Sequence, residues 1–330
     1  GTFTLGGVGA DFATLTELGN ILSNCGVSGN VIVNVAPGTY AGRLILDHIP
    51  GTSSSATVLI NGGSADSVTF DNTIGFSNVY FDGADWTTIK NITLENLGTN
   101  DCYGVQLRDS AMNNTIDSCV INMETTTTNL NDVTGVSASS SETSDTGEGD
   151  NAYWTTVSNC QFNGGEQAIH FEGASASRNI GNSFINNTMD LVEDYGIYMD
   201  DQDSIQIIGN TITNLRSAFA DGIYVFDMMM YDISYNKVVN APDYGFYLSD
   251  GNFDAAPTSR GTITNNMISS TSDYGMYIDD VNQTDIFHNT VANISTSNAA
   301  FRVNDIIDVD IRNNTFYSDG DFAFDALDPI

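Results

Sequence analysis

One motif recurs through most of the chain. Its clearest copy occupies residues 194–217, DYGIYMDDQDSIQIIGNTITNLRS, in which turn residues separate three short runs with alternating apolar residues. Units of the same kind follow at 220–240, 243–269, 273–293 and 299–318. A short unit of this kind buries its apolar face by stacking on its neighbours. The sequence therefore predicts a solenoid.

Two columns of residues fix the period. The residue that opens the first run of each unit is, in order, Gly104, Gly135, Ala168, Gly196, Gly222, Gly245, Gly275, Ala300 and Ala323. Spacings range from 23 residues (Gly222 to Gly245) to 33 residues (Gly135 to Ala168), as expected for coils with loops of variable length. A second column, in phase with the first, reads Ile92, Cys119, Cys160, Asn187, Asn210, Asn236, Asn266, Asn289 and Asn314.

Stacked parallel coils explain the asparagine column. Equivalent residues of adjacent coils lie about 4.8 Å apart, which is the spacing of paired strands. Asn tolerates the left-handed backbone of a tight turn, and its side-chain amide can bond to the Asn above and below. We therefore expect an internal Asn ladder.

This pattern resembles the pectate-lyase-like right-handed β-helix superfamily, whose coils carry such a ladder between the second and third sheets. The resemblance covers roughly residues 86–330. It implies an all-β fold, a single-stranded right-handed parallel β-helix (solenoid) of roughly a dozen coils, and it implies no activity. Residues 196–200 are then a first-sheet strand, 204–208 a second-sheet strand and 211–213 a third-sheet strand.

Residues 1–46 are expected to close the first coil. Thr14 and Glu17 fit a capping box, and an apolar stripe of helical period follows, comprising Phe12, Leu15, Leu18, Ile21 and Leu22. We expect a capping helix there, because an open coil would expose core and unpaired strand edges. The opening is also similar to that of pectinesterases, but their later motifs are missing, so the resemblance does not extend to that activity.

The whole chain, 1–330, is interpreted as one β-helix domain, because a solenoid needs no second core. Residues 139–150 have the sequence SSSETSDTGEGD, which contains no apolar residue. This composition predicts a solvent-exposed loop that leaves the coil. Residues 322–330 begin another first-sheet strand without an evident cap, which suggests a chain or assembly that continues past Ile330.

The charge restricts the partners. The chain has 42 acidic residues against 9 Lys and Arg, a formal net charge of −33. This excludes nucleic acid and anionic membranes as natural partners and favours cations or a neutral or cationic ligand. No apolar run is long enough to span a bilayer, and Gly1 starts no signal-peptide pattern, as in a mature secreted chain. We expect a secreted, extracellular or cell-surface protein.

The four cysteines, Cys25, Cys102, Cys119 and Cys160, fit no zinc or redox motif. Cys119 and Cys160 occupy the ladder column in neighbouring coils. Stacked buried thiols and a disulfide are both compatible with that placement.

Strand alternation points to the outer face of the first sheet as the working surface. Ile197 and Met199 should point inward, and Tyr198 and Asp200 outward. The outward positions then form one column of aromatic residues that ends near a guanidinium, comprising Tyr198, Tyr224, Tyr247, Tyr277 and Arg302. Such rings either bind a glycan or a protein, or only pack on one another.

The candidate catalytic residues are His170, Glu172, Tyr198 and Asp200. Glu172 and Asp200 would lie one coil apart, a placement that glycoside hydrolysis by paired carboxylates can use. His170 beside Tyr198 could instead abstract a proton from a uronate. The pairs at 200–201 and 279–280 resemble those of polygalacturonases, but the partner motifs of that family are missing.

Two acidic columns predict bound Ca²⁺, because like charges stacked at coil spacing repel unless a cation bridges them or solvent separates them. The candidate ligands are Asp194, Asp243 and Asp273 before the first-sheet strands, and Asp201, Asp250, Asp280 and Asp305 after them. Solvated turn acids are the alternative. No motif calls for an organic cofactor.

We therefore expect a secreted, non-catalytic cell-surface or matrix protein that acts in adhesion, glycan contact or self-association. Its partners would be a polysaccharide, another surface glycan or copies of itself. The alternative is a polysaccharide lyase or glycoside hydrolase that acts along the first sheet.

Overall fold

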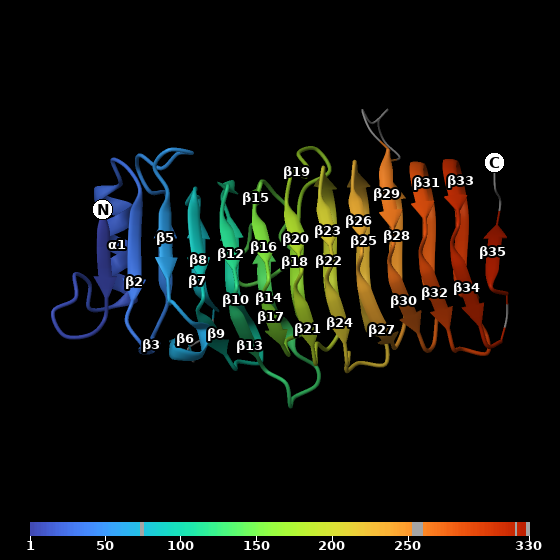
Figure 1. Ribbon diagram of the computed structural model, residues 1–330, viewed down its shortest axis with the longest axis horizontal. Coiled ribbons are helices and arrows are strands. Elements are labelled where there is room, and N and C mark those ends of the chain that lie inside the picture. Colours follow the sequence, from blue (N-terminus) through green and yellow to red (C-terminus); the bar gives the residue numbers. More distant parts are fainter. Residues whose placement is uncertain (73–75, 253–259, 321, 328–330) are drawn as a thin grey trace.

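The computed structural model describes residues 1–72, 76–252, 260–320 and 322–327. It is a right-handed parallel β-solenoid of about a dozen turns, with one α-helix, α1, near the N-terminus. Figure 1 shows the coils side by side along one axis, from α1 at one end to β35 at the other. The fold predicted from the repeat is confirmed. The end of the chain expected at 328–330 lies outside the described residues.

Each coil contributes a strand to each of three parallel sheets. The first sheet contains β4 (Leu44–Asp47), β7 (Phe76–Asp82), β10 (Asn100–Arg108), β14 (Asn131–Ala138), β18 (Gln167–Glu172), β22 (Tyr195–Asp203), β25 (Asp221–Met229), β28 (Phe246–Gly251), β31 (Met276–Phe287), β33 (Phe301–Arg312) and β35 (Phe324–Leu327).

The second sheet contains β1 (Thr2–Leu5), β2 (Val31–Val35), β5 (Val58–Asn61), β8 (Thr87–Lys90), β12 (Thr115–Asp117), β16 (Thr156–Ser158), β20 (Ser183–Ile185), β23 (Gln206–Ile208), β26 (Asp232–Ser234) and β29 (Gly261–Thr264), and it continues into the later halves of β31 and β33.

The third sheet contains β3 (Gly38–Ala41), β6 (Val68–Asp71), β9 (Thr93–Asn96), β13 (Val120–Met123), β17 (Gln161–Asn163), β21 (Thr188–Asp190), β24 (Thr211–Thr213), β27 (Lys237–Ala241), β30 (Met267–Ser270), β32 (Thr290–Asn293) and β34 (Thr315–Ser318). Short connecting elements are β11 (Ala111–Met112), β15 (Ala152–Tyr153), β19 (Asn179–Ile180) and a 3₁₀ turn, η1 (Ala65–Ser67).

Register stacks identical positions on one another. Ile197 pairs with Ile169 on one side and with Ile223 on the other, and all three are fully buried. The opening glycines pack still closer. A Cβ on Gly196 would lie 2.6 Å from the carbonyl oxygen of Gly222. The glycine column therefore reflects the close approach of neighbouring coils where the chain enters the first sheet.

The Asn ladder is present. The side-chain amide of Asn210 donates to Oδ1 of Asn236 (3.0 Å) and to the carbonyl oxygen of Phe184 (2.9 Å). Its own Oδ1 accepts from the backbone N–H and the amide of Asn187, both at 3.0 Å. The same bonds continue through the later members of the column, Asn236, Asn266, Asn289 and Asn314.

One detail of the predicted ladder is wrong. The residue with left-handed backbone is the one before each ladder position, such as Asn186 (φ 55°) and Gly209 (φ 70°). The ladder Asn follows the bend and turns its amide inward. All four cysteines are free thiols in the structure, and Cys119 and Cys160 donate to backbone carbonyls as the ladder amides do.

The cap is α1 (Leu15–Cys25), which begins after Thr14 as the N-cap. The Glu17 N–H donates to Oγ1 of Thr14 (3.1 Å), and the Glu17 carboxylate accepts from the N–H of Ala13 (2.7 Å). Gly19 allows the helix to pack on β4, because a Cβ there would lie 2.2 Å from the carbonyl oxygen of Ile45. Ile21, expected in the buried stripe, is 44% exposed. The described residues contain no helix that is long and apolar enough to cross a membrane.

Asn210→Ala should lower the free energy of unfolding by about 2–4 kcal/mol, because it leaves the buried N–H of Asn187 and the carbonyl of Phe184 without partners. Chemical denaturation measures the loss. The matched control is Thr188→Ala, at an exposed position of the adjacent third-sheet strand. Equal stability of the two variants would contradict the structural role of the ladder.

Candidate functional site: the outer face of the first sheet

Four tyrosines lie in register on consecutive first-sheet strands, as the alternation predicts. Tyr198 pairs with Tyr224, Tyr224 with Tyr247, and Tyr247 with Tyr277. The rings of Tyr198 and Tyr224 are parallel (4°) at 5.6 Å, and those of Tyr224 and Tyr247 are stacked at 4.6 Å. All four are half-buried. The ring faces of Tyr198, Tyr224 and Tyr247 thus cover one another, whereas Tyr277 meets Tyr247 edge to face (72°). The stacked rings leave their edges and hydroxyl groups available to a ligand.

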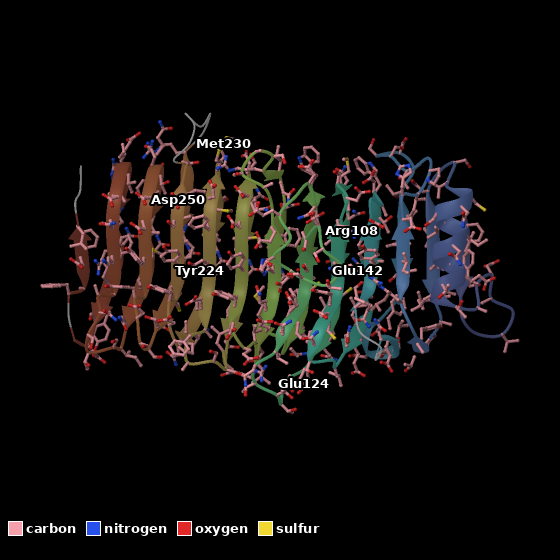
Figure 2. All side chains as sticks on the ribbon, turned by 180° about the vertical axis from the view of Figure 1, so that it is seen from behind. Arg108, Glu124, Glu142, Tyr224, Met230 and Asp250 are labelled. Carbon is pink, nitrogen blue, oxygen red and sulfur yellow. The ribbon has the colours of Figure 1, made fainter. Side chains whose placement is uncertain are left out.

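A second set of tyrosines, which the sequence analysis missed, lies beside the first. Tyr195, Tyr244 and Tyr274 contact the rings of the first set at centroid distances of 5.3–6.2 Å. The signal was the triplet DYG, which occurs at 194–196, 243–245 and 273–275. We call the seven rings the tyrosine face: Tyr195, Tyr198, Tyr224, Tyr244, Tyr247, Tyr274 and Tyr277. Figure 2 labels one of them, Tyr224.

Arg302 ends the tyrosine face on the C-terminal side. Its guanidinium lies 5.1 Å from the ring centroid of Tyr274 and 5.5 Å from that of Tyr277, and it donates to the Tyr274 hydroxyl. Its Nε is buried without a hydrogen-bond partner among the described residues. The sequence placed Arg302 on this face, and the structure brings it into contact with the rings.

Carboxylates border the tyrosine face. Asp221 pairs with Tyr195 in register, is only 4% exposed and accepts from the N–H of Tyr244 (2.8 Å). Burial, followed by repulsion from Asp243 and Asp194, raises the pKa of Asp221 to about 8. The sequence analysis passed over this residue because it directly precedes the Gly of its unit, where the three DYG units have Tyr. The acids of neighbouring coils therefore lie close enough along this border to repel one another.

The opposite border contains Asp200 and Asp201. Burial, together with repulsion from Glu172, raises the pKa of Asp200 to about 7. Burial and the neighbouring Asp227 raise the pKa of Asp201 to about 7. Arg178 pairs with Asp227 and lies 3.9 Å from Oδ1 of Asp201.

The predicted catalytic set is only partly accessible. Nε2 of His170 lies 2.7 Å from Oε1 of Glu172, and the His170 ring contacts the Tyr198 ring at 4.4 Å. The sequence analysis placed His170 and Glu172 on an open surface, which is wrong: they are 2% and 5% exposed. Asp145, from the segment 139–150, lies against His170, with its Oδ2 3.6 Å from Nδ1. Of the four candidates, Tyr198 and Asp200 keep exposed surface.

The acidic column after the first-sheet strands coincides with a left-handed bend of the backbone. Four of the predicted metal ligands have left-handed backbone, a conformation that Asp adopts more easily than most residues: Asp201, Asp250, Asp280 and Asp305. Burial, Asp279 and Asp250 raise the pKa of Asp280. In the described part of the chain, no three His, Cys, Asp or Glu side chains group closely enough to hold a metal ion.

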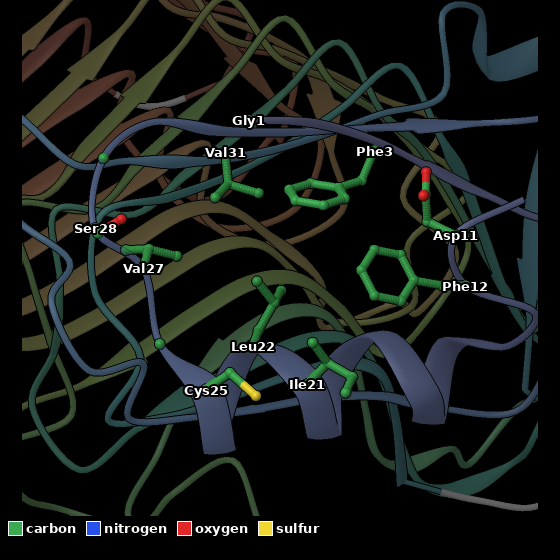
Figure 3. Close-up of a pocket in the computed structure, with 12 residues that line it drawn as sticks. Gly1, Phe3, Asp11, Phe12, Ile21, Leu22, Cys25, Val27, Ser28 and Val31 are labelled. Carbon is green, nitrogen blue, oxygen red and sulfur yellow. The ribbon is translucent and has the colours of Figure 1, made fainter.

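A separate cavity of about 520 Å³ opens at the N-terminal end of the solenoid (Figure 3). Apolar side chains dominate its lining, including Phe3, Phe12, Ile21, Leu22 and Val31. The cavity lies between α1 and the first second-sheet strands, away from the tyrosine face. Its position indicates the end of the core rather than a site with convergent polar groups.

Comparison with known proteins supports the fold. The sequence profile of the family described as "Right handed beta helix region" matches residues 77–256 and 195–327. No curated protein matches the chain in sequence.

Solved structures share the architecture at low identity. The Streptococcus pneumoniae surface adhesin PfbA is 13% identical, with a TM-score of 0.55 over 99% of this chain and 93% of that one. The alginate lyase from Paenibacillus sp. str. FPU-7 is 11% identical, with a TM-score of 0.51 over 97% and 98%. The A-module of the Azotobacter vinelandii mannuronan C-5 epimerase AlgE6 is also 11% identical, with a TM-score of 0.51 over 98% and 96%. At these identities the likeness concerns the fold alone.

We expect stability to fall as the pH rises through 7–8. Asp200, Asp201 and Asp221 hold their protons in the folded protein up to about pH 7, 7 and 8, whereas the unfolded chain loses them near 3.8. The folded state therefore binds more protons between these values, and stability present below pH 4 is lost as the pH rises. Thermal melts across that range measure the slope.

Asp221→Asn should flatten this slope and raise Tm at pH 8 by several degrees, because an Asn oxygen can still accept from the N–H of Tyr244. Asp66→Asn, at an exposed position, is the control. If Asp221→Asn lowers Tm at pH 8 while Asp66→Asn does not, the repulsion account is incorrect.

The expected role of Ca²⁺ is tested in the same assay. Stacked Asp side chains and a net charge of −33 predict that Ca²⁺ raises Tm above its value in EDTA by more than NaCl of matched ionic strength does. Equal protection by NaCl would reduce the effect to screening.

Proposed function

The chain belongs to the right-handed β-helix family, and we propose that it is a secreted, non-catalytic surface protein that holds a polysaccharide along the tyrosine face. The observation that carries the proposal is the tyrosine face itself, seven half-buried rings on four adjacent coils with Arg302 at one end. A solenoid presents such a row on a rigid surface that an extended polymer can follow. The fold shared with the surface adhesin PfbA and with an alginate lyase is compatible with this role.

The charge of the face selects the ligand. Acidic residues lie along both borders of the face: Asp194, Asp221, Asp243 and Asp273 on one side, and Asp200 and Asp279 on the other. Among the described residues, Arg302 is the one cation that contacts these rings. A polyanion would be repelled by those of these acids that are ionised, and protonated Asp200 and Asp221 offer it no positive charge. A neutral or amine-bearing glycan can donate its hydroxyl or ammonium protons to them, so we propose that class of polysaccharide.

Self-association is the competing use of the same surface. A second copy would place another acidic face, from a chain of net charge −33, against this one. Like charges in contact are unfavourable unless cations bridge them. The glycan is therefore the better occupant, and sedimentation in the absence of glycan tests the alternative.

A polysaccharide lyase or hydrolase is the second candidate function. It is favoured by Asp200, whose pKa near 7 beside Glu172 suits a general acid. Against it, His170 and Glu172 are 2% and 5% exposed, so neither is open to a substrate in this conformation. Release of reducing or unsaturated ends from polysaccharides, abolished by Glu172→Gln, would establish catalysis and reject the non-catalytic role.

Tyr224→Ala should weaken binding of cellohexaose or of a chitosan hexamer about tenfold, because the ring lies at the centre of the face. The free energy of unfolding should fall by only about 1 kcal/mol, since the inward core residue Ile223 is untouched. Calorimetric titration and denaturation measure the two quantities.

Two comparisons make this result interpretable. Tyr235 is an exposed tyrosine between the second and third sheets, so the variant Tyr235→Ala should bind both oligosaccharides as the wild type does. A galacturonic acid hexamer should bind more weakly than both other probes. Normal binding by Tyr224→Ala would refute the recognition role of the face. If Tyr224→Ala lost several kcal/mol of unfolding free energy, the rings would be part of the hydrophobic core rather than a binding surface.

A further inference from the structure

Residues 139–150, which leave the first sheet after β14 and return at β15, fold back over that sheet. We call this segment the strap. Its composition is typical of a solvated loop, yet Asp145 is only 2% exposed. The strap closes on itself through the N–H of Ser140, which donates to the Gly147 carbonyl (2.9 Å), and through Oγ of Ser139, which accepts from the Gly147 N–H (3.0 Å). It is therefore an ordered cover.

Polar contacts alone tie the strap to the sheet, since it has no apolar side chain. Glu142 pairs with Arg43 (2.5 Å), which directly precedes β4, three first-sheet strands away from β14, and the Ser141 carbonyl accepts from Nε2 of Gln106 (2.9 Å). Oδ2 of Asp145 accepts from Oγ1 of Thr134 (2.7 Å) and from Nε2 of Gln167 (3.1 Å). Figure 2 labels Glu142 close to Arg108 on the N-terminal side of Tyr224. Segments held without buried apolar contacts open at low free-energy cost.

Beneath and beside the strap, four buried polar atoms have no hydrogen-bond partner among the described residues. They are the hydroxyls of Tyr80, Tyr103 and Ser137 and Oε1 of Gln106. The four residues belong to three adjacent strands, β7, β10 and β14, and Gln106 pairs in register with both Tyr80 and Ser137. A buried polar group without a partner costs about 1–3 kcal/mol, so a cluster of four on one surface calls for a role.

This covered strip continues the tyrosine face toward the N-terminus. Ser137 pairs with His170, and His170 pairs with Tyr198, whose ring it contacts. At the far edge of the strap a polar cavity of about 440 Å³ opens between Arg108, Ser140 and Asp150. A polymer lying on the tyrosine face would therefore meet the strap next, and then this cavity.

We propose that the strap is a movable cover over a second polysaccharide subsite, in which Tyr80, Tyr103, Gln106 and Ser137 bind sugar hydroxyl groups when the strap lifts. The proposal rests on the proposed function and extends it by adding a gated subsite in line with the tyrosine face. Sugar hydroxyls both donate and accept, so they match the three unpaired hydroxyls and the unpaired amide oxygen.

Opening of the strap is tested without a ligand. In a Cys25→Ser background, Ser137→Cys places a thiol under the strap, and mass spectrometry follows its reaction with a maleimide. The buried core thiol of Cys160 reports global unfolding in the same molecule. We expect the thiol at 137 to react at least tenfold faster than Cys160, and faster again when Glu142→Ala removes the pair with Arg43. Equal rates at both thiols would overturn the proposal.

The subsite is tested with the conservative variants Ser137→Ala and Tyr103→Phe. Each removes an unpaired buried hydroxyl, so Tm should stay the same or rise, while affinity for cellohexaose should fall about tenfold. A purely structural role would lower Tm and leave binding unchanged, which would overturn the proposal.

The outcome for the tyrosine face separates the two claims. If Tyr224→Ala loses binding while Ser137→Ala and Tyr103→Phe bind normally, the face functions and the subsite does not exist. If the wild type binds neither cellohexaose nor a chitosan hexamer, both claims fail.

Discussion

Hydrogen bonding between equivalent residues of successive coils is the interaction on which this structure depends. Because every first-sheet strand pairs in parallel and in register with the next, each side-chain position becomes a column along the axis. The Asn ladder, the buried isoleucines and the tyrosine face are three such columns, all set by the same strand register. A residue type that suits its position in one coil is reinforced by its neighbours, which explains how so short a unit specifies a long fold.

The same register places acidic side chains of neighbouring coils next to one another, and burial, together with their repulsion, raises their pKa values. Asp221 shows the effect most clearly: it is buried beside Asp194 and Asp243 and keeps its proton to about pH 8. Arg178 relieves a similar conflict where it pairs with Asp227 near Asp201. With 9 Lys and Arg in the chain, such relief is local. A ligand that brings hydroxyl or ammonium protons to these borders would be favoured on electrostatic grounds, which links the acidity of the protein to the class of glycan proposed.

Periodic features were predictable from sequence, and features outside the period were not. The ladder at Asn210 and the outward column at Tyr224 follow from repeat and alternation alone. Tyr195, Tyr244 and Tyr274 repeat too, but they precede the strand alternation used to assign faces. The burial of His170 was not predictable, because it depends on Asp145 in a segment whose composition indicates only a solvated loop. A loop that folds back makes contacts that no local pattern encodes.

The central claim is that a polysaccharide lies along the outer face of the first sheet. Hydroxyl-radical footprinting with mass spectrometry, in the presence and absence of cellohexaose, tests it most directly because Tyr oxidation reports on each ring separately. The account predicts protection of Tyr198, Tyr224, Tyr247 and Tyr277 together, with no change at Tyr235 and Tyr317, which are exposed elsewhere on the coils. Protection at those two residues, or at Phe3 and Phe12 in the N-terminal cavity, with none along the tyrosine face would contradict it.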